Sequence, residues 1–434
     1  MKNKKLFSLI VTSVSLALLL GLLLGTGLFA KNAKNDLSGN VKRVLIKPND
    51  AESDVKIKSK AEVDIQHEFK GKFSANVPEN LIPELQKIAD VEDVVVLELA
   101  NIGIASCGDG VADPSEKCGE PGLNACPQGK ECQNCKCVKQ RNEQPTERSC
   151  FPQNQLPYNV VQVNGGQAGA GQGIDVAILD TGAYKEHIDL DIKVCKDTTR
   201  RGIKNNCKDT HGHGTHVAGT VGANGGNDQQ GIYGVAPNVN IWSIKVCYSS
   251  YCNDDDIAEG IEFAAQNGAE IISMSISGPE STPLIEEAIK KYPDVLFVAA
   301  AGNSGPAENS IEYPAAYPEV VAVAAHDSNK IVTSFSSRGL TDGNDLVISE
   351  RELELSGGGS SVESTYKSGC YAYMSGTSMA TPTLAGLAAK VWQGSAQATR
   401  DYLVSITEDI TQSSGGGAGP GYDIASGYGM PVAL

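Results

Sequence analysis

Four polar residues of the chain have the side-chain types that acyl transfer requires: Asp180, His213, Asn303 and Ser378. In such chemistry a serine hydroxyl attacks a carbonyl, an imidazole takes the proton, a carboxylate holds the imidazole, and an amide donates to the oxyanion. Each residue alone has a simpler explanation, because aspartate and asparagine are common in turns and serine is a common helix N-cap. Their presence together predicts a nucleophilic serine.

The segments around these residues fit that chemistry. Ser378 follows a Gly-Thr pair, and residues 378–393 have the small, apolar composition of a buried helix. At a helix N-terminus, unpaired N–H groups and the helix dipole favour a developing oxyanion. His211, His213 and His216 are close in sequence. Two histidines three apart on a helix could bind a metal, but the glutamate of an HExxH motif is missing.

Residues 150–434 alternate between apolar strands and helices, which indicates an α/β fold with a mostly parallel central sheet. The expected strands cover residues 173–179, 240–246, 270–275, 295–300 and 320–325, and the expected helices cover 213–222, 254–267, 283–291 and 378–393. Such folds bind ligands beyond the carboxyl ends of their strands. Asp180 and Asn303 each follow an expected strand, so both belong at that edge.

Four long motifs contain the four residues: ILDTG at 178–182, HGTHVAG at 213–219, AAGNSG at 300–305 and SGTSMATP at 375–382. In this order they resemble the subtilisin-like (subtilase) family of serine proteases, over roughly residues 150–434. The resemblance implies a three-layer subtilisin-like α/β fold, and a serine endopeptidase that hydrolyses peptide bonds through an acyl-enzyme.

The resemblance also implies a role for each residue. Ser378 is the nucleophile, His213 the general base and acid, and Asp180 the carboxylate that orients the imidazole. The Asn303 amide and the Ser378 N–H form the oxyanion hole. His216 is then a structural histidine on the same helix.

The same resemblance places protein or peptide substrates between two segments, represented by Ser275, Ser277 and Gly278 on one side and by Ala300 and Gly302 on the other. Ser277 stands where relatives usually have glycine, so it could narrow the primary pocket. Residues 254–256 are three aspartates that could favour basic substrates, although an acidic helix start explains them more simply.

A structural Ca²⁺ site is expected on oxygen-rich loops. Asp189 matches a calcium-ligand aspartate of relatives, and the segment 224–231 falls where they carry a calcium loop. The expected ligands are Asp189, Asn154, Asn224, Asn227 and Asp228. The alternative is that this Asn/Gly-rich segment is an ordinary turn, and its length differs from the subtilisin pattern. No catalytic metal is expected.

Residues upstream of the catalytic domain divide into four parts. Residues 1–30 read as a signal peptide or a retained membrane anchor, because Lys4 and Lys5 precede an uncharged apolar run, so a secreted or cell-surface protein is expected. Residues 41–105 read as a small α+β domain that resembles the inhibitory propeptide of subtilases, with cleavage expected near Ala105 or Ser106. A cysteine-rich module at 106–138 and a linker at 139–149 follow, before the catalytic domain at 150–434.

The chain of 434 residues has 12 cysteines, which form disulfides in an exported protein. Six lie in the cysteine-rich module, where zinc binding is a less favoured alternative. Proximity in sequence pairs Cys195 with Cys207 and Cys247 with Cys252, and elimination leaves Cys150 with Cys370.

The formal net charge of −16 argues against nucleic acid as a ligand. A monomer is expected, with the propeptide as an intramolecular inhibitor. The main rival is a binding protein that keeps an inactive protease fold, and it is opposed by the intact set of four residues. A cysteine or metal hydrolase is opposed by the lack of a cysteine paired with a histidine motif and of a complete metal-ligand set.

Overall fold

The computed structural model describes residues 41–48, 51–87, 91–97, 99–102, 130–133, 136–139, 150–341 and 347–434. The chain divides into two compact units, with the boundary between Val96 and Leu97. The expected signal or anchor, all but the first residue of the linker and most of the cysteine-rich module lie outside the described residues. In the described part of the chain, no helix has the length and apolarity needed to cross a membrane.

The N-terminal unit is a four-stranded antiparallel sheet with the strand order β2-β3-β1-β4, accompanied by two helices. Its elements are β1 (Val41–Pro48), α2 (Ala51–Lys58), β2 (Asp64–Phe69), β3 (Lys72–Pro78), the 3₁₀ turn η1 (Glu79–Leu81), α3 (Ile82–Lys87) and β4 (Val91–Val96). Val44, Ile46 and Phe73 are central to its buried core. The small α+β architecture predicted for this region is present. The prediction above gives only the class of this domain, and the structure adds its individual elements.

The larger unit is built on a seven-stranded parallel sheet with the order β17-β16-β15-β13-β8-β10-β9. Its strands are β8 (Asp175–Asp180), β9 (Ile192–Asp197), β10 (Asn240–Lys245), β13 (Ile271–Met274), β15 (Leu296–Ala300), β16 (Val320–His326) and β17 (Leu355–Gly358). The predicted α/β class and mostly parallel sheet are confirmed. Strands β9 and β17, at the two edges of the sheet, were not predicted.

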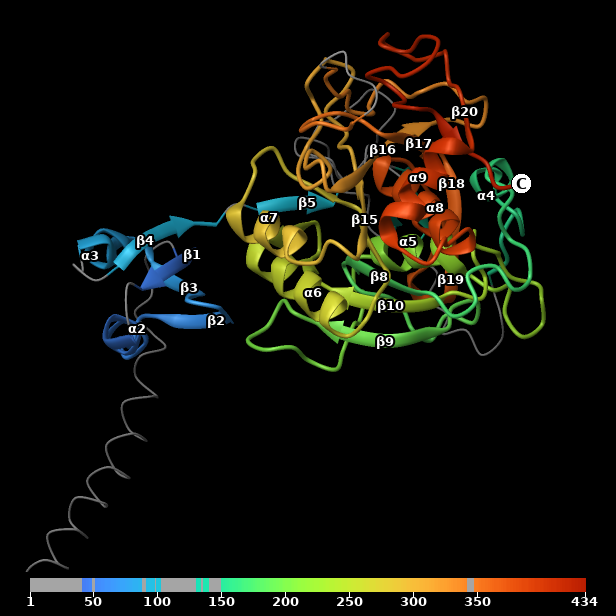
Figure 1. Ribbon diagram of the computed structural model, residues 1–434. Helices are drawn as coiled ribbons and strands as arrows, with labels where there is room; N and C mark the ends of the chain where they lie inside the picture. The colour runs from blue at the N-terminus through green and yellow to red at the C-terminus, as the bar shows by residue number, and fades with distance from the viewer. Residues whose placement is uncertain are drawn as a thin grey trace, which may run out of the picture. The chain divides into compact units, whose positions relative to one another are not determined.

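Helices cover both faces of this sheet, giving three layers (Figure 1). Ile178 of β8 shares one core with Val217 and Val221, whereas its neighbour Leu179 faces the other way and lies against Gly260. The helices are α4 (Tyr158–Gln162), α5 (His213–Gly222), α6 (Asp254–Gln266), α7 (Pro283–Lys290), α8 (Thr377–Lys390) and α9 (Ala396–Ser405). Helices α5 and α8 pack together on one face. Both begin near the carboxyl ends of the strands, because His213 of α5 contacts Asp180 at the end of β8 and Ser378 of α8 contacts Ser275 just after β13.

Short strands outside the main sheet form separate ribbons. They are β5 (Leu99–Ile102), β6 (Lys130–Gln133), β7 (Lys136–Lys139), β11 (Cys247–Tyr248), β12 (Tyr251–Asn253), β14 (Ile276–Ser277), β18 (Val362–Tyr366), β19 (Cys370–Met374), β20 (Thr407–Glu408) and β21 (Met430–Pro431), with a 3₁₀ turn η2 (Lys367–Gly369). One small sheet has the order β11-β12-β5-β14. The segment of β5 therefore lies between two strands of the larger unit.

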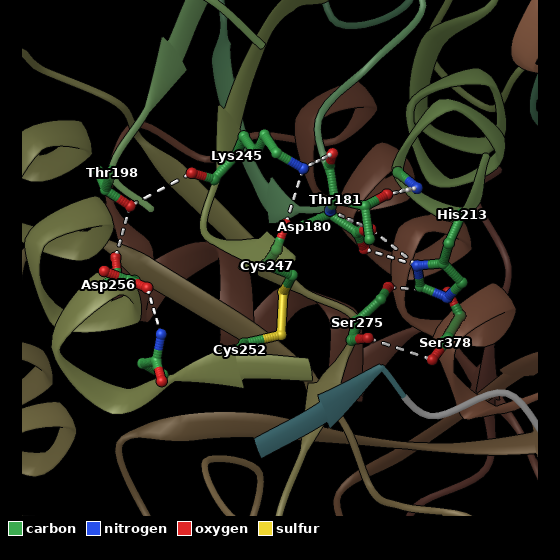
Figure 2. The surroundings of a disulfide bond; sticks show 12 residues. Asp180, Thr181, Thr198, His213, Lys245, Cys247, Cys252, Asp256, Ser275 and Ser378 are labelled. Carbon is green, nitrogen blue, oxygen red and sulfur yellow. Dashed lines mark hydrogen bonds and ion pairs between the residues drawn. A yellow bond between two sulfur atoms is a disulfide. The ribbon is translucent and has the colours of Figure 1, made fainter. Parts of the chain in front are cut away.

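Three disulfides among the described residues of the larger unit match the predicted pairs. They join Cys150 to Cys370, Cys195 to Cys207, and Cys247 to Cys252. Cys247 and Cys252 are directly opposite in the β11–β12 hairpin (Figure 2). The Cys150–Cys370 bridge ties the start of the unit to the β18–β19 hairpin across 220 residues of sequence.

Candidate active site

Asp180 and His213 form a fully buried pair at the carboxyl edge of the sheet. Asp180 is the last residue of β8 and His213 is the first residue of α5. The Nδ1 atom of His213 lies 2.8 Å from Oδ1 and 2.9 Å from Oδ2 of the carboxylate. This contact makes Nδ1 the protonated donor, which leaves Nε2 as an acceptor. The buried Nε2 atom has no hydrogen-bond partner among the described residues.

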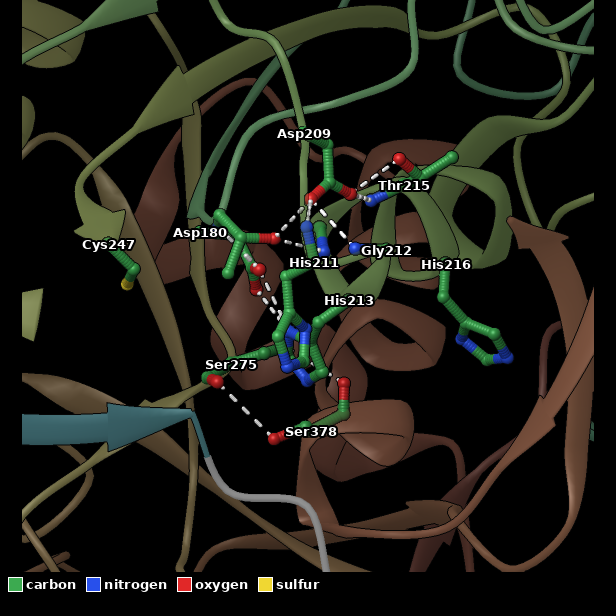
Figure 3. A network of polar contacts seen from close by, with 12 residues as sticks. Asp180, Asp209, His211, Gly212, His213, Thr215, His216, Cys247, Ser275 and Ser378 are labelled. Carbon is green, nitrogen blue, oxygen red and sulfur yellow. Dashed lines mark hydrogen bonds and ion pairs between the residues drawn. The ribbon is translucent and has the colours of Figure 1, made fainter. Parts of the chain in front are cut away.

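Ser378 lies beside this imidazole. Figures 2 and 3, from different directions, both place its side chain next to the His213 ring. Helix α8 begins one residue earlier than predicted, so Ser378 is its second residue. Its Oγ donates to the carbonyl oxygen of Ser275 at 3.3 Å, and the Ser275 hydroxyl donates to the Ser378 carbonyl at 2.8 Å. These two bonds tie Ser378, in the first turn of α8, to the segment that follows β13.

Hydrogen bonds to its side-chain oxygen hold Asn303 in place, while its side-chain N–H groups have no acceptor among the described residues. Its Oδ1 accepts the backbone N–H of Thr377 at 3.0 Å and the Thr377 hydroxyl at 3.2 Å. Its buried Nδ2 has no hydrogen-bond partner among the described residues. A buried amide donor without an acceptor costs about 1–3 kcal/mol. A ligand oxygen bound at this position would therefore recover stabilisation that the free site lacks.

The carboxylate of Asp209, which the sequence analysis missed, organises the loop in front of α5 (Figure 3). Its Oδ1 accepts the backbone N–H groups of His211 and Gly212 at 2.9 and 2.8 Å. Its Oδ2 accepts the N–H and the hydroxyl of Thr215 at 2.9 and 2.6 Å. A sequence signal existed, because an acidic residue just before a helix is favoured by the helix dipole.

Thr181 connects Asp209 to Asp180. The Thr181 hydroxyl donates to Asp209 Oδ1 at 3.0 Å, and the Thr181 N–H donates to Asp180 Oδ1 at 2.6 Å. The same hydroxyl accepts the N–H of Gly214 at 2.9 Å. The strand that ends at Asp180 and the helix that begins at His213 are therefore joined through Thr181 as well as by the Asp180–His213 contact itself.

This arrangement holds a serine hydroxyl, an oriented imidazole with a free acceptor nitrogen, and a free amide donor, which are the parts of an acyl-transfer site. A family model described as the subtilase family matches residues 171–429, more than half of the chain. The chain belongs to the subtilase family.

Curated relatives and solved structures agree with this assignment. A subtilisin of Bacillus sp. (strain TA39) is 43% identical over 290 residues, which cover 61% of this chain and 68% of that protein. Subtilisin DY of Bacillus licheniformis is 40% identical over 271 residues, covering 59% and 93% of the two chains. The structure called Sphericase matches with a TM-score of 0.62 at 40% identity, over 65% of this chain and all of that one. The protein is a subtilisin-like serine endopeptidase.

The two histidines that flank His213 in sequence, His211 and His216, do not hydrogen-bond to Asp180. His216 is buried in α5, with its Nε2 2.9 Å from the carbonyl oxygen of Val362. Burial lowers the pKa of His216 to about 4. His211 packs edge-on against His213 with ring centroids 6.3 Å apart. Burial, and then the neighbouring His213, lower the pKa of His211 to about 4. Both side chains are neutral near pH 7.

A buried lysine lies behind the pair (Figure 2). Lys245, in register with Asp180 on the adjacent strand, donates from Nζ to the carbonyl oxygens of Thr181 and Cys247, both at 2.8 Å. Burial lowers the pKa of Lys245, while Asp209, Asp197 and Asp180 act in the opposite direction. The lysine thus places a cation near three buried carboxylates.

The two predicted substrate segments are adjacent to the serine. Ser275 contacts Ser378 directly, and Ser277 is a buried residue of β14. Ala300 ends β15, and Gly302 follows with φ of +106°. The N–H of Gly278 donates to the carbonyl of Tyr313 at 2.9 Å. The aspartates at 254–256 form the first turn of α6, as the simpler explanation required.

The residues predicted to bind calcium are only partly brought together. Asp189 lies against the loop 224–231, because its Oδ2 accepts the N–H of Ile232 at 2.9 Å and its carbonyl accepts that of Asn224 at 2.9 Å. Asn224 and Asp228 cap turns within this loop, and Asn227 is exposed. Asn154 is elsewhere: its amide nitrogen lies 3.4 Å from Glu363 and from the Tyr373 hydroxyl.

Proposed function

We propose that this subtilase hydrolyses peptide bonds with Ser378 as nucleophile, His213 as general base and acid, Asp180 as its orienting carboxylate and Asn303 as an oxyanion donor. The observation that carries the proposal is the Asp180–His213 contact at 2.8 Å, which leaves Nε2 without a partner among the described residues and next to the serine. The unused Nδ2 of Asn303 supports the last role.

In the proposed reaction, His213 Nε2 takes the proton of Ser378 as Oγ bonds to the scissile carbonyl carbon. The carbonyl oxygen becomes an oxyanion that accepts hydrogen bonds from Asn303 and from the N–H of Ser378. The imidazolium returns the proton to the leaving amine, and the carbon–nitrogen bond breaks. A water molecule then attacks the acyl-enzyme, with His213 taking its proton and passing it to Ser378 Oγ as the acyl bond breaks, which releases the carboxylic acid product.

Labelling with a serine-directed phosphonate tests these assignments. The processed enzyme is expected to become labelled at Ser378 and to lose peptidase activity in step with labelling. Ser378→Ala should not be labelled, whereas Ser375→Ala, three residues earlier, should be labelled normally. An active, processed enzyme that resists the reagent, or an active Ser378→Ala variant, would overturn the proposal.

We also propose that the enzyme is made as a zymogen inhibited by its own N-terminal segment. Support comes from β5, which pairs antiparallel with both β12 and β14. In this position Asn101 is opposite Ser277 and Ile102 is opposite Ile276. Figure 2 shows the blue arrow of β5 running toward Ser378. His213 and Ser378 have no exposed surface, which fits a form of the enzyme that substrate cannot reach.

Processing near Ala105 or Ser106, which lie outside the described residues, would release residues 1–105 and leave the cysteine-rich module on the mature enzyme. N-terminal sequencing of the mature protein tests this. Ser378→Ala is expected to remain unprocessed when expressed alone. A mature enzyme that begins after Arg148 would contradict retention of the module. Export by the apolar N-terminal segment, with secretion or anchoring at the cell surface, is part of the same proposal.

A structural calcium ion fits the residues around Asp189, and we propose it for this chain. The Oδ1 atom of Asp189 is buried and has no hydrogen-bond partner among the described residues. The carbonyl oxygens of Gln229 and Gly231 lie close together, since both accept from the amide of Gln155, and Gly231 packs against the Asp189 carboxylate. A bare carboxylate oxygen beside neighbouring carbonyls suits a hard cation. Asp189 and these loop carbonyls would hold it, and it would fix the loop to the body of the domain.

A further inference from the structure

The side chain of Glu312 lies against the residue that precedes the proposed oxyanion donor. The backbone N–H of Glu312 donates to the carbonyl oxygen of Ala301 at 2.9 Å. A Cβ atom built on Gly302 would lie 2.9 Å from Cδ and 3.0 Å from Cγ of Glu312. The carboxyl group is therefore packed on Gly302, one residue before Asn303, and only a glycine there leaves room for it.

Glu312 is next to the residue that bridges the two segments expected to line the substrate. Ala301 and Gly302 belong to one segment. Tyr313, the next residue after Glu312, pairs with Gly278 of the other, with N–H···O distances of 2.9 and 2.8 Å in the two directions. Glu312 thus lies where the two segments are bridged.

The charge of this carboxylate is not neutralised by an ion pair with any of the described residues. Its Oε1 accepts the hydroxyl of Ser304, which is a neutral donor. In the part of the chain that the structure describes, no lysine or arginine forms an ion pair with it. Arg351 stacks at 5.7 Å over the neighbouring Tyr313 ring, but its guanidinium donates to Asn309 and to the Ile311 carbonyl instead. Oε2 accepts no hydrogen bond from the described residues.

A substrate side chain can supply the missing cation. The residue that carries the scissile carbonyl must place that carbonyl at Asn303, so its side chain leaves the backbone beside Gly302. A lysine or arginine there can lay its methylene groups along Gly302 and bring its charge to Glu312. A leucine would leave the carboxylate unpaired, and a glutamate would be repelled.

We propose that Glu312 is a specificity-determining residue, which makes the enzyme prefer lysine or arginine on the acyl side of the scissile bond. This inference rests on the proposed function. It assigns a preference for basic residues to Glu312 rather than to Asp254, Asp255 and Asp256, which are buried in the first turn of α6.

Three peptides that differ only at this position, with arginine, leucine or glutamate, test the preference on the mature enzyme. The wild type should cleave the arginine peptide with a kcat/KM about 10- to 100-fold above the leucine peptide, the range of a charge-assisted hydrogen bond. Glu312→Gln keeps an acceptor for Ser304 and should bring this ratio close to one. Glu312→Lys should favour the glutamate peptide. Glu308→Gln, an exposed glutamate four residues earlier, is the matched control and should keep the wild-type ratio.

The wild-type profile is decisive even if a variant fails to fold. Cleavage of the leucine peptide as fast as the arginine peptide, or an unchanged ratio in a folded Glu312→Gln enzyme, would overturn the inference and leave the peptidase assignment intact. Failure to cleave any peptide after correct processing would overturn both. Peptide aldehydes give a second readout that does not depend on turnover: an argininal should bind the wild type more tightly than a phenylalaninal, and Glu312→Gln should remove the difference.

Discussion

Asp209 and Thr181 are joined by a buried hydrogen bond of 3.0 Å that links the loop before His213 to the end of the strand that carries Asp180. The bond belongs to a set of five that the Asp209 carboxylate accepts. Neither residue is proposed to touch the substrate. The relationship matters because catalysis by an Asp-His pair depends on geometry that the two side chains cannot maintain alone.

We expect Asp209→Asn to lower kcat with little change in KM. An asparagine has the same shape, but its amide nitrogen cannot accept the bonds made by the loop and by Thr181. A misplacement of about 1 Å at the His213 ring is enough for a loss of roughly 10²-fold. Steady-state kinetics with a good peptide substrate measure it. Asp191→Asn, at an exposed aspartate, is the control. A change in KM alone, or melting at the assay temperature, would contradict a positioning role.

Asn303→Ala should lower kcat by about 10²–10³-fold while KM changes little, a magnitude taken from subtilisin itself rather than from this structure. The amide donor is unused in the free site, so its hydrogen bond forms only when the oxyanion develops. Asn309→Ala, at a nearby exposed asparagine, should have a much smaller effect on kcat. Equal losses in kcat and in substrate affinity would show that Asn303 binds the ground state as well.

Two of the disulfides close loops of very different length and should differ in their effect on stability. Cys150–Cys370 closes a loop with a sequence separation of 220, whereas Cys247–Cys252 has a separation of 5. Loop-closure entropy predicts losses of about 5 and about 2 kcal/mol when each pair is changed to serine. Urea unfolding in a Ser378→Ala background, which prevents self-digestion, measures both. The chain-entropy account fails here if the short bridge contributes as much as the long one.

The sequence predicted the elements that carry the proposed catalytic residues. Residues 213–222 were predicted as a helix and form α5 with these bounds, because the glycine-rich turn before His213 and the apolar pattern after it both mark the helix. The strand that ends at Asp180 and the helix that contains Ser378 were also predicted, to within two or three residues at each end. Strong local patterns specify these elements.

Residues whose roles depend on non-local contacts were missed. Glu312 is ten residues beyond Gly302 in sequence, and only the path of the intervening loop brings its carboxylate back onto that glycine. Strand β17 contains Leu355, Ser356 and two glycines, a composition that is weak for a strand until β16 pairs with it. Asn154 was assigned to the calcium loop by its position in the sequence, yet Gln155 is the residue that reaches it.

The free energy of unfolding should fall as the pH falls from 6.5 toward 4. Burial lowers the pKa of His216 to about 4 and that of His326 to about 3 in the folded chain. The unfolded chain, with histidine pKa values near 6.5, binds more protons in this window, so acid favours unfolding. Above pH 6.5 both states are neutral and the effect is absent.

His326→Gln isolates one contribution, because glutamine stays neutral and can bond to Ser356 or Gln162, the partners of His326. In the Ser378→Ala background, this variant should lose less stability than its parent between pH 6.5 and 4, by about 1–3 kcal/mol. Urea unfolding at several pH values measures the difference. If the free energies of unfolding of the two proteins ran parallel against pH, His326 would take up its proton as readily in the folded chain as in the unfolded chain.

Removal of calcium should lower the melting temperature of the mature enzyme. A cation at Asp189 would bind the folded chain but not the unfolded chain, so a chelator removes stabilisation that grows with the free calcium concentration. With calcium at 100 times its dissociation constant, the loss is about 2.7 kcal/mol. Asp189→Asn should melt at a lower temperature and be insensitive to chelator. Asp191→Asn, two residues away and exposed, should respond as the wild type does. A wild-type melting temperature that is the same in chelator and in excess calcium would exclude a stabilising ion here.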